Sequence, residues 1–135
     1  MKYILLLLIS FNVFAIDIVS ERRLVNAVSM GASSTSSAIE LNQFSGISIM
    51  ASVTASAAAV GSLKLQASND WTAEASIVNW VDIASSSNAV AGNGSFLWNL
   101  NDSYYKWVRL VYTRTSGSGT LNAQWNVKDS NANNR

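Results

Sequence analysis

Strict alternation of apolar and polar residues is the feature that most constrains this chain. In the run GISIMASV at 46–53, Ile47, Ile49, Ala51 and Val53 fall on one phase of a period of two. The same period recurs in four later runs, at 62–68, 95–101, 106–113 and 120–129. Successive side chains of a strand point to opposite faces of its sheet, so the pattern predicts strands with one buried and one solvent-facing side. That arrangement is typical of antiparallel sheets.

Clusters of Ser, Gly and Asn separate these runs. They are MGASSTSS at 30–37, SSSNAVAGNGS at 85–95 and TSGSG at 115–119, and such clusters are typical of turns and loops. No stretch after Ile16 has a helical period. Several short strands at this spacing predict an all-β, antiparallel β-sandwich of about eight strands.

The N-terminus MKYILLLLISFNVFA reads as a secretory signal peptide. Lys2 is the positive region, an apolar run follows, and Val13 and Ala15 stand at the −3 and −1 positions of a cleavage site. A membrane anchor is the alternative, but a run of about a dozen residues is short of the ~20 that span a bilayer. We therefore expect a signal peptide at 1–15, one domain at 16–128 and a flexible polar tail at 129–135. The protein would be secreted or extracellular, and attachment to the cell surface stays open.

Charge and residue types argue against several function classes. The formal net charge is +1, and removal of Lys2 leaves eight basic against eight acidic residues. A neutral chain lacks the basic footprint of a nucleic-acid binder or of a protein held to anionic lipid. The chain has no His and no Cys, and no serine lies in a G-x-S-x-G turn. We expect neither enzymatic activity nor a cofactor; a bound calcium is compatible with such sandwiches, but no ligand cluster demands one.

The five tryptophans fall on different phases of the pattern. Trp98 and Trp125 share the apolar phase and are expected in the core. Trp107 lies on the opposite phase, where it either covers the second sheet or stands exposed beside Arg109. In the second case these two residues would form a contact face. Trp71 differs from all of them because it follows Asn69 and Asp70 in a polar loop.

Simple connections between antiparallel strands make successive loops alternate between the two ends of a sandwich. Loops 42–45, 69–78 and 101–104 would then share one end, and loops 55–60, 85–93 and 115–118 the other. An exposed Trp stacks on a sugar face, and neighbouring polar groups bind hydroxyls. The alternative is that Trp71 folds back over the open end of the sandwich. The candidate ligand-binding residues at this end are Asn69, Asp70, Trp71, Glu74, Asp102 and Tyr104.

Three segments resemble discoidin-like modules, the coagulation-factor type C and galactose-binding-like domains. They are LKLQASND at 63–70, NWVDI at 79–83 and KWVRLVY at 106–112. The resemblance implies an eight-stranded jelly roll that binds glycans, lipid headgroups or proteins through loops at one end. The bridging cysteines of that family are absent, and Trp71 stands where its glycine is expected. The chain also resembles short modules of phage virions and tails.

Two functions follow as expectations. The first is a secreted, non-catalytic module for adhesion or carbohydrate binding, which recognises a surface glycan or surface protein. The second is a structural subunit of a virion, appendage or surface layer, suggested by the low charge and the Ser-, Ala- and Asn-rich surface. Neither a nucleic acid nor a stable membrane span is expected, and a homo-oligomer is an open alternative.

Overall fold

The computed structural model of the protein describes residues 22–41, 44–101 and 104–129. The expected signal peptide and the tail beyond Asp129 lie outside the described residues. Within them the fold is all-β, with antiparallel pairing throughout and no α-helix, so the predicted fold class is confirmed. Its strands are β1 (Arg22–Ser29), β2 (Ser34–Thr35), β3 (Ile39–Glu40), β4 (Phe44–Ser68), β5 (Val81–Asp82), β6 (Asn88–Ala91), β7 (Gly94–Asn101) and β8 (Trp107–Asp129). A short 3-10 helix, η1, covers Glu74–Ser76.

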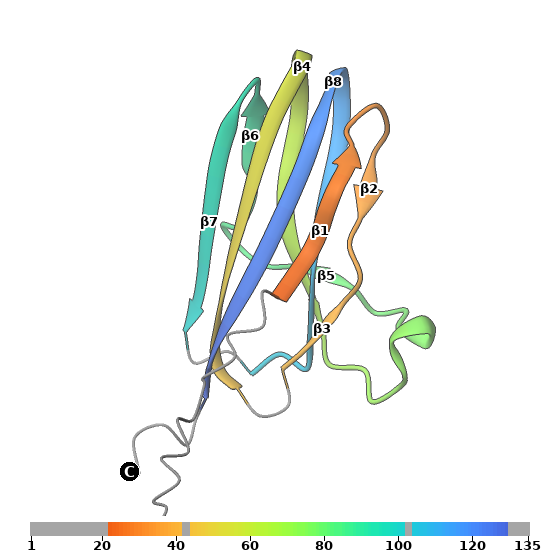
Figure 1. Cartoon of the computed structure of the whole chain (residues 1–135). Coiled ribbons are helices and arrows are strands. Elements are labelled where there is room, and N and C mark those ends of the chain that lie inside the picture. The colour runs from red at the N-terminus through yellow and green to blue at the C-terminus, as the bar shows by residue number, and fades with distance from the viewer. Residues whose placement is uncertain (1–21, 42–43, 102–103, 130–135) are drawn as a thin grey trace, which may run out of the picture.

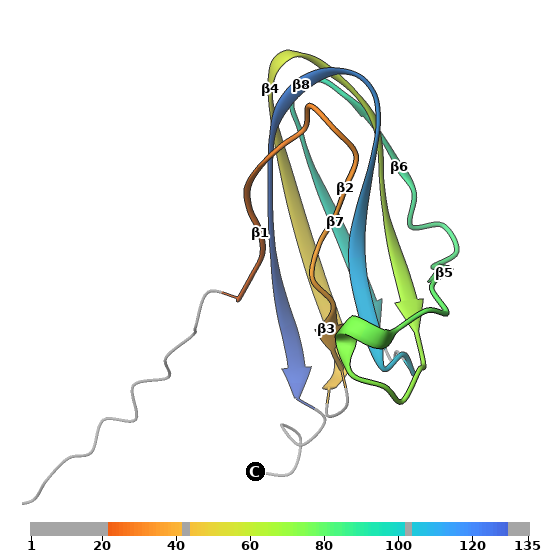
Figure 2. The same ribbon diagram turned by 90° about the vertical axis from the view of Figure 1, so that its right-hand side faces the viewer.

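One continuous sheet folds over on itself to give two layers (Figures 1 and 2). The long strands β4 and β8 pair with each other over almost their whole length and bend together at the top of the molecule. The first half of β4 and the second half of β8 form the first layer with β1 and β7. The other halves form the second layer with β2, β3, β5 and β6. The jelly-roll connectivity implied by the discoidin-like resemblance stays a prediction.

The predicted loops at 55–60 and 115–118 are wrong, because β4 and β8 run through them as bent strands. The predicted loop at 85–93 is wrong in part, because it contains β6. The ladder between the two strands continues across the bend, with register shifts between Ala55 and Gly61. Gly117 makes the bend sterically feasible. Its φ is +70°, and a Cβ at this position would lie 2.3 Å from the carbonyl oxygens of Ala57 and Ala58. Small residues that read as a loop in the sequence therefore permit a close crossing of two strands.

The core lies between the layers, and the alternation correctly predicts which side chains enter it. Ile49 and Leu65, from the two halves of β4, are fully buried. Leu110 and Leu121 of β8 meet them from both layers. Trp98 is also buried, and its indole Nε1 donates a hydrogen bond of 2.7 Å to the carbonyl oxygen of Ser86.

Strand β1 was not predicted, and its irregular pairing explains why. Its register against β8 shifts between Arg23 and Val25 and again between Val25 and Val28. Ala27 has φ +49°. Each bulge resets the alternation of side chains, so no period of two survives in the sequence.

Candidate functional site

The loop 69–80 leaves β4 at the lower end of the second layer and passes close to the start of β8 (Figure 2). Two hydrogen bonds tie the beginning of this loop to the first residue of β8 and to the residue just before it. The side-chain oxygen of Asn69 accepts from the backbone N–H of Lys106 at 2.9 Å. The indole Nε1 of Trp107 donates to the carbonyl oxygen of Asp70 at 3.0 Å. The loop is thus fixed to the strand that lies beside β4.

The carboxylate of Asp70 closes the loop on itself. It accepts hydrogen bonds from the backbone N–H groups of Val78 and Asn79, both at 3.1 Å, and from the side-chain amide of Asn79 at 2.9 Å. These donors lower the pKa of Asp70 from its usual value, and the side-chain amide of Asn79 has the largest effect. Asp70 therefore holds together the two ends of a ten-residue excursion.

Glu74 anchors the middle of the same loop. It lies in η1, and its carboxylate accepts a hydrogen bond from the backbone N–H of Ala38, just before β3. Asn69, Asp70 and Glu74 thus all bond to the protein itself. The structure places these three predicted residues in one loop and gives each of them a part in fixing its shape.

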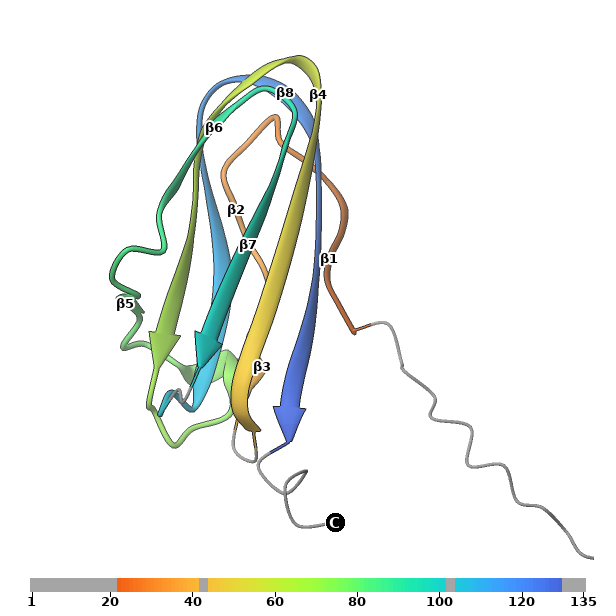
Figure 3. The same cartoon turned by 90° about the vertical axis from the view of Figure 1, so that its left-hand side faces the viewer.

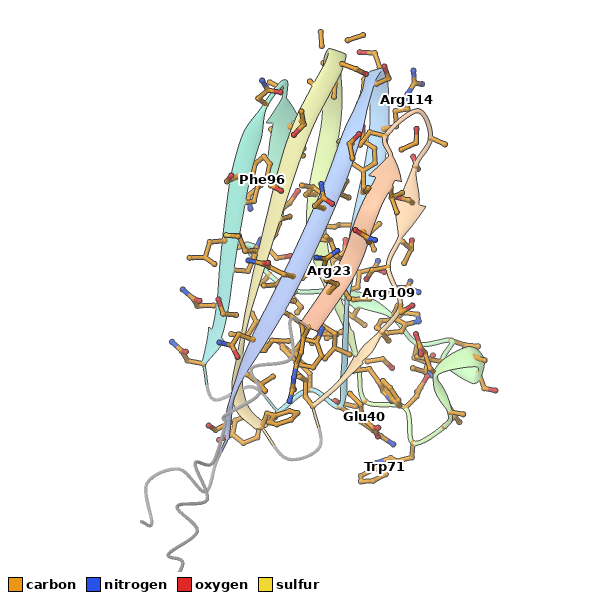
Figure 4. All side chains as sticks on the ribbon, viewed as in Figure 1. Arg23, Glu40, Trp71, Phe96, Arg109 and Arg114 are labelled. Carbon is orange, nitrogen blue, oxygen red and sulfur yellow. The ribbon has the colours of Figure 1, made fainter. Side chains whose placement is uncertain are left out.

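Trp71 extends from this fixed loop into solvent, at the lower end of the molecule in Figure 4. Its side chain is 86 % exposed, so it does not fold back over the open end. The ammonium group of Lys106 lies 4.4 Å from its ring centroid, a cation–π contact on one side of the indole. Tyr104 is 93 % exposed, and Asp102 lies outside the described residues.

The candidate contact face of Trp107 and Arg109 is occupied by intramolecular contacts. Trp107 is only 8 % exposed, so the first of its two predicted alternatives, burial, holds. The guanidinium of Arg109 lies 4.0 Å from the ring centroid of Trp80 and donates two hydrogen bonds to the side-chain oxygen of Gln66, at 2.9 and 2.7 Å. Partial burial lowers the pKa of Arg109 from its usual value. Both side chains support the second layer.

A hollow of about 430 Å³ lies beside the loop. Sequence reasoning missed Asn79 and Tyr105, which help to line it, and Lys106, which touches Trp71. The adjacent tyrosines Tyr104 and Tyr105 were the one available signal for these residues, because two aromatic residues in a polar connection are unusual. The lining of the hollow combines apolar and polar side chains: Ala67, Ser68, Asn69, Asp70, Asn79, Val81, Asp82, Ile83 and Tyr105.

The described part of the chain contains no group of three His, Cys, Asp or Glu side chains placed to hold a metal ion. Nor does any helix in residues 22–41, 44–101 and 104–129 have the length and apolar character needed to cross a membrane.

Comparison with known proteins gives a similarity in structure but none in sequence. No protein-family model matches the chain, and none of the curated proteins compared with it matches either. The chain is similar to the crystal structure of the SPBc2 prophage-derived protein YomS, with a TM-score of 0.48 and 10 % sequence identity. The similarity covers 79 % of this chain and 92 % of that one.

Proposed function

We propose that this protein is a secreted, non-catalytic binding module that recognises a glycan at the end of the fold formed by loop 69–80. The observation that carries the proposal is the 86 % exposure of Trp71 on a loop tied down by its own polar side chains. Holding a large apolar ring in water has no benefit for folding. A ring that is already positioned loses little conformational freedom when a ligand stacks on it.

The arrangement suits a sugar better than an extended apolar ligand. The C–H face of a pyranose packs on an indole ring, while its hydroxyls need donors and acceptors nearby. The hollow beside the loop offers such groups, among them the amide of Asn79 and the side chains of Asp82 and Tyr105. Asn69, Asp70 and Glu74 would then act by positioning Trp71, in place of the direct hydroxyl contacts expected for Asn69 and Asp70.

The test is a glycan-binding screen of the purified protein, with Trp71→Ala and Trp71→Tyr beside the wild type. We expect Trp71→Ala to weaken binding about 5- to 30-fold, since a stacked aromatic contributes about 1–2 kcal/mol. Trp71→Tyr keeps an aromatic face and should retain most of the affinity. Val28→Ala is the matched control, because Val28 is an exposed apolar residue on β1, in the other layer.

Equal affinity of the wild type and Trp71→Ala for the same glycan would refute the assignment of Trp71. Absence of binding to every glycan, together with capture of one defined surface protein that depends on Trp71, would replace the glycan with a protein ligand. The melting temperature should stay within a few degrees in all three variants, because each change is at an exposed position.

A structural subunit of a larger assembly is the second candidate. One observation favours it: no charged residue occurs in β7, in residues 46–55 of β4 or in residues 118–127 of β8, the three adjacent strands of the first layer. A surface without charge has no electrostatic repulsion against its own copies. Recovery of the protein from native particles or appendages, in regular stoichiometry, is the expected result. A protein found only in free form would contradict this candidate.

A further inference from the structure

The free edges of the two layers differ in how well they are protected. An edge strand presents unpaired backbone N–H and C=O groups, which proteins protect from pairing with other chains by shortness, charge, proline or bulges. In the second layer the outer strands are short: β2, β3 and β5 have two residues each and β6 has four. The two long edges belong to β1 and β7 in the first layer.

Strand β1 is protected by charge and by shape. It begins with Arg22 and Arg23 and has two register shifts against β8. Ala27 takes a left-handed conformation with φ +49°, which interrupts the regular edge. A second chain would meet an irregular row of hydrogen-bonding groups flanked by guanidinium groups.

Strand β7 has none of these protections. It pairs with β4 at eight successive positions, from Gly94↔Val53 to Asn101↔Gly46, without a register shift. It contains neither a charged residue nor a proline. Figures 1 and 3 show β7 at the outside of the first layer, with no other described strand beyond it.

The side chains of β7 are also incompletely covered. Leu97 points away from the core and is 61 % exposed. Phe96 and Leu100 point toward the core, yet both are only partly buried. Figure 4 places Phe96 at this outer strand. Another strand added beside β7 would cover apolar surface on both faces of the sheet and pair its backbone groups.

We propose that β7 pairs antiparallel with β7 of a second copy of this chain, so that the first layers of two protomers form one continuous sheet. A strand paired with its own copy about a twofold axis is self-complementary. With Leu97 opposite Leu97 of the other copy, Ser95 lies opposite Asn99 at two symmetric positions. This register places the most exposed apolar side chain of the strand in the centre, between hydroxyl and amide neighbours.

The pairing is independent of the ligand proposed for loop 69–80. Loop 69–80 belongs to the second layer, whereas β7 is the edge of the first. A protein that binds no glycan can still dimerise, and a monomer can still bind. A closed dimer also does not by itself make the protein an assembly subunit, because a repeating assembly needs a further interface.

The first experiment measures molar mass by light scattering across a concentration series. We expect twice the mass of one chain for the wild type and the mass of one chain for Leu97→Lys, which puts a charge at the exposed edge without touching the core. Gln124→Lys is the matched control. Leu97 on β7 and Gln124 on β8 lie opposite Met50 of β4, one on each side of it. The Gln124→Lys substitution therefore adds the same charge to the same face of the sheet, away from the edge. This variant should stay dimeric. A monomeric wild type, or a Leu97→Lys variant that dimerises like wild type, would overturn the proposal.

The second experiment tests the register by cysteine cross-linking. The chain has no cysteine, so a single introduced thiol can form a disulfide only between two copies. Residues opposite each other in an antiparallel pair have Cα atoms about 4.5–5.5 Å apart, within the range of a disulfide. We expect Leu97→Cys to yield a disulfide-linked dimer on mild oxidation, and Val28→Cys on the protected edge β1 to remain monomeric on a non-reducing gel. Equal cross-linking of the two variants would contradict pairing through β7.

Discussion

Replacement of Trp107 by phenylalanine tests how the fold holds the candidate site. Trp107 is buried at the start of β8, and its indole N–H reaches the carbonyl oxygen of Asp70 at 3.0 Å. Phenylalanine fills part of the same space but has no donor. The substitution therefore removes one hydrogen bond between strand and loop and part of a buried ring, while every residue of the loop stays unchanged.

Two contributions set the magnitude of the effect. A partly buried hydrogen bond to the backbone contributes about 0.5–1.5 kcal/mol. The smaller ring buries roughly 40 Å² less apolar surface, which is worth about 1 kcal/mol at 25 cal/mol per Å². We expect the free energy of unfolding to fall by about 2 kcal/mol, a large share of the ~5–15 kcal/mol of a typical domain. Because the lost hydrogen bond is the one that ties Trp107 to the loop at Asp70, glycan affinity at the loop should fall together with stability.

The assay is urea unfolding monitored by far-UV circular dichroism. Tryptophan fluorescence is unsuitable as the probe because the substitution itself removes a tryptophan. The midpoint should fall with the slope unchanged. Trp71→Phe is the matched control: its side chain is exposed, so we expect a change of about 0.5 kcal/mol or less. A Trp107→Phe variant as stable as wild type, or a Trp71→Phe variant destabilised as much as Trp107→Phe, would refute this prediction.

Two further predictions concern the loop and the bend. The pKa of Asp70 is lower in the folded protein than its value in the unfolded chain, near 3.8. The ionised carboxylate therefore contributes fully to stability above the unfolded pKa, and this contribution is lost as the pH falls through the folded pKa. Acidification below about pH 4 should therefore lower the hydrogen-exchange protection of the Val78 and Asn79 amides, measured relative to unstructured amides at the same pH. Unchanged protection would refute the role of the carboxylate. Gly117→Ala should destabilise the protein by about 2 kcal/mol or more, because its Cβ would meet two carbonyl oxygens at 2.3 Å. Gly92 also has a positive φ, but a Cβ at this position would meet no atom within 4 Å. Gly92→Ala should therefore lower the melting temperature less, and its loss measures the backbone strain alone.

Much of the fold could be predicted from local patterns, and much of the site could not. The alternation at 46–53 and 106–113 correctly places apolar residues such as Ile49, Val108 and Leu110 in the core, because a strand imposes that period wherever one face is covered. The same pattern left Trp107 undecided. It lies on the outward phase, yet it is buried, and its indole donates a hydrogen bond to the loop beside it. Likewise, nothing local to Asp70 reveals that its partners are eight and nine residues away.

The sequence by itself determined the antiparallel all-β class, the core positions and the grouping of Trp71 with Asn69 and Asp70 in one polar loop. These follow from the side-chain period and from residue preferences, which act over a few neighbouring residues. Only the tertiary structure decided that 55–60 and 115–118 are bends within continuous strands, that Trp71 is exposed while Trp107 is buried, and that β7 is an unprotected edge. Each of these depends on which distant segment lies alongside, and hydrogen bonding and burial between distant segments are settled only when the whole sheet has formed.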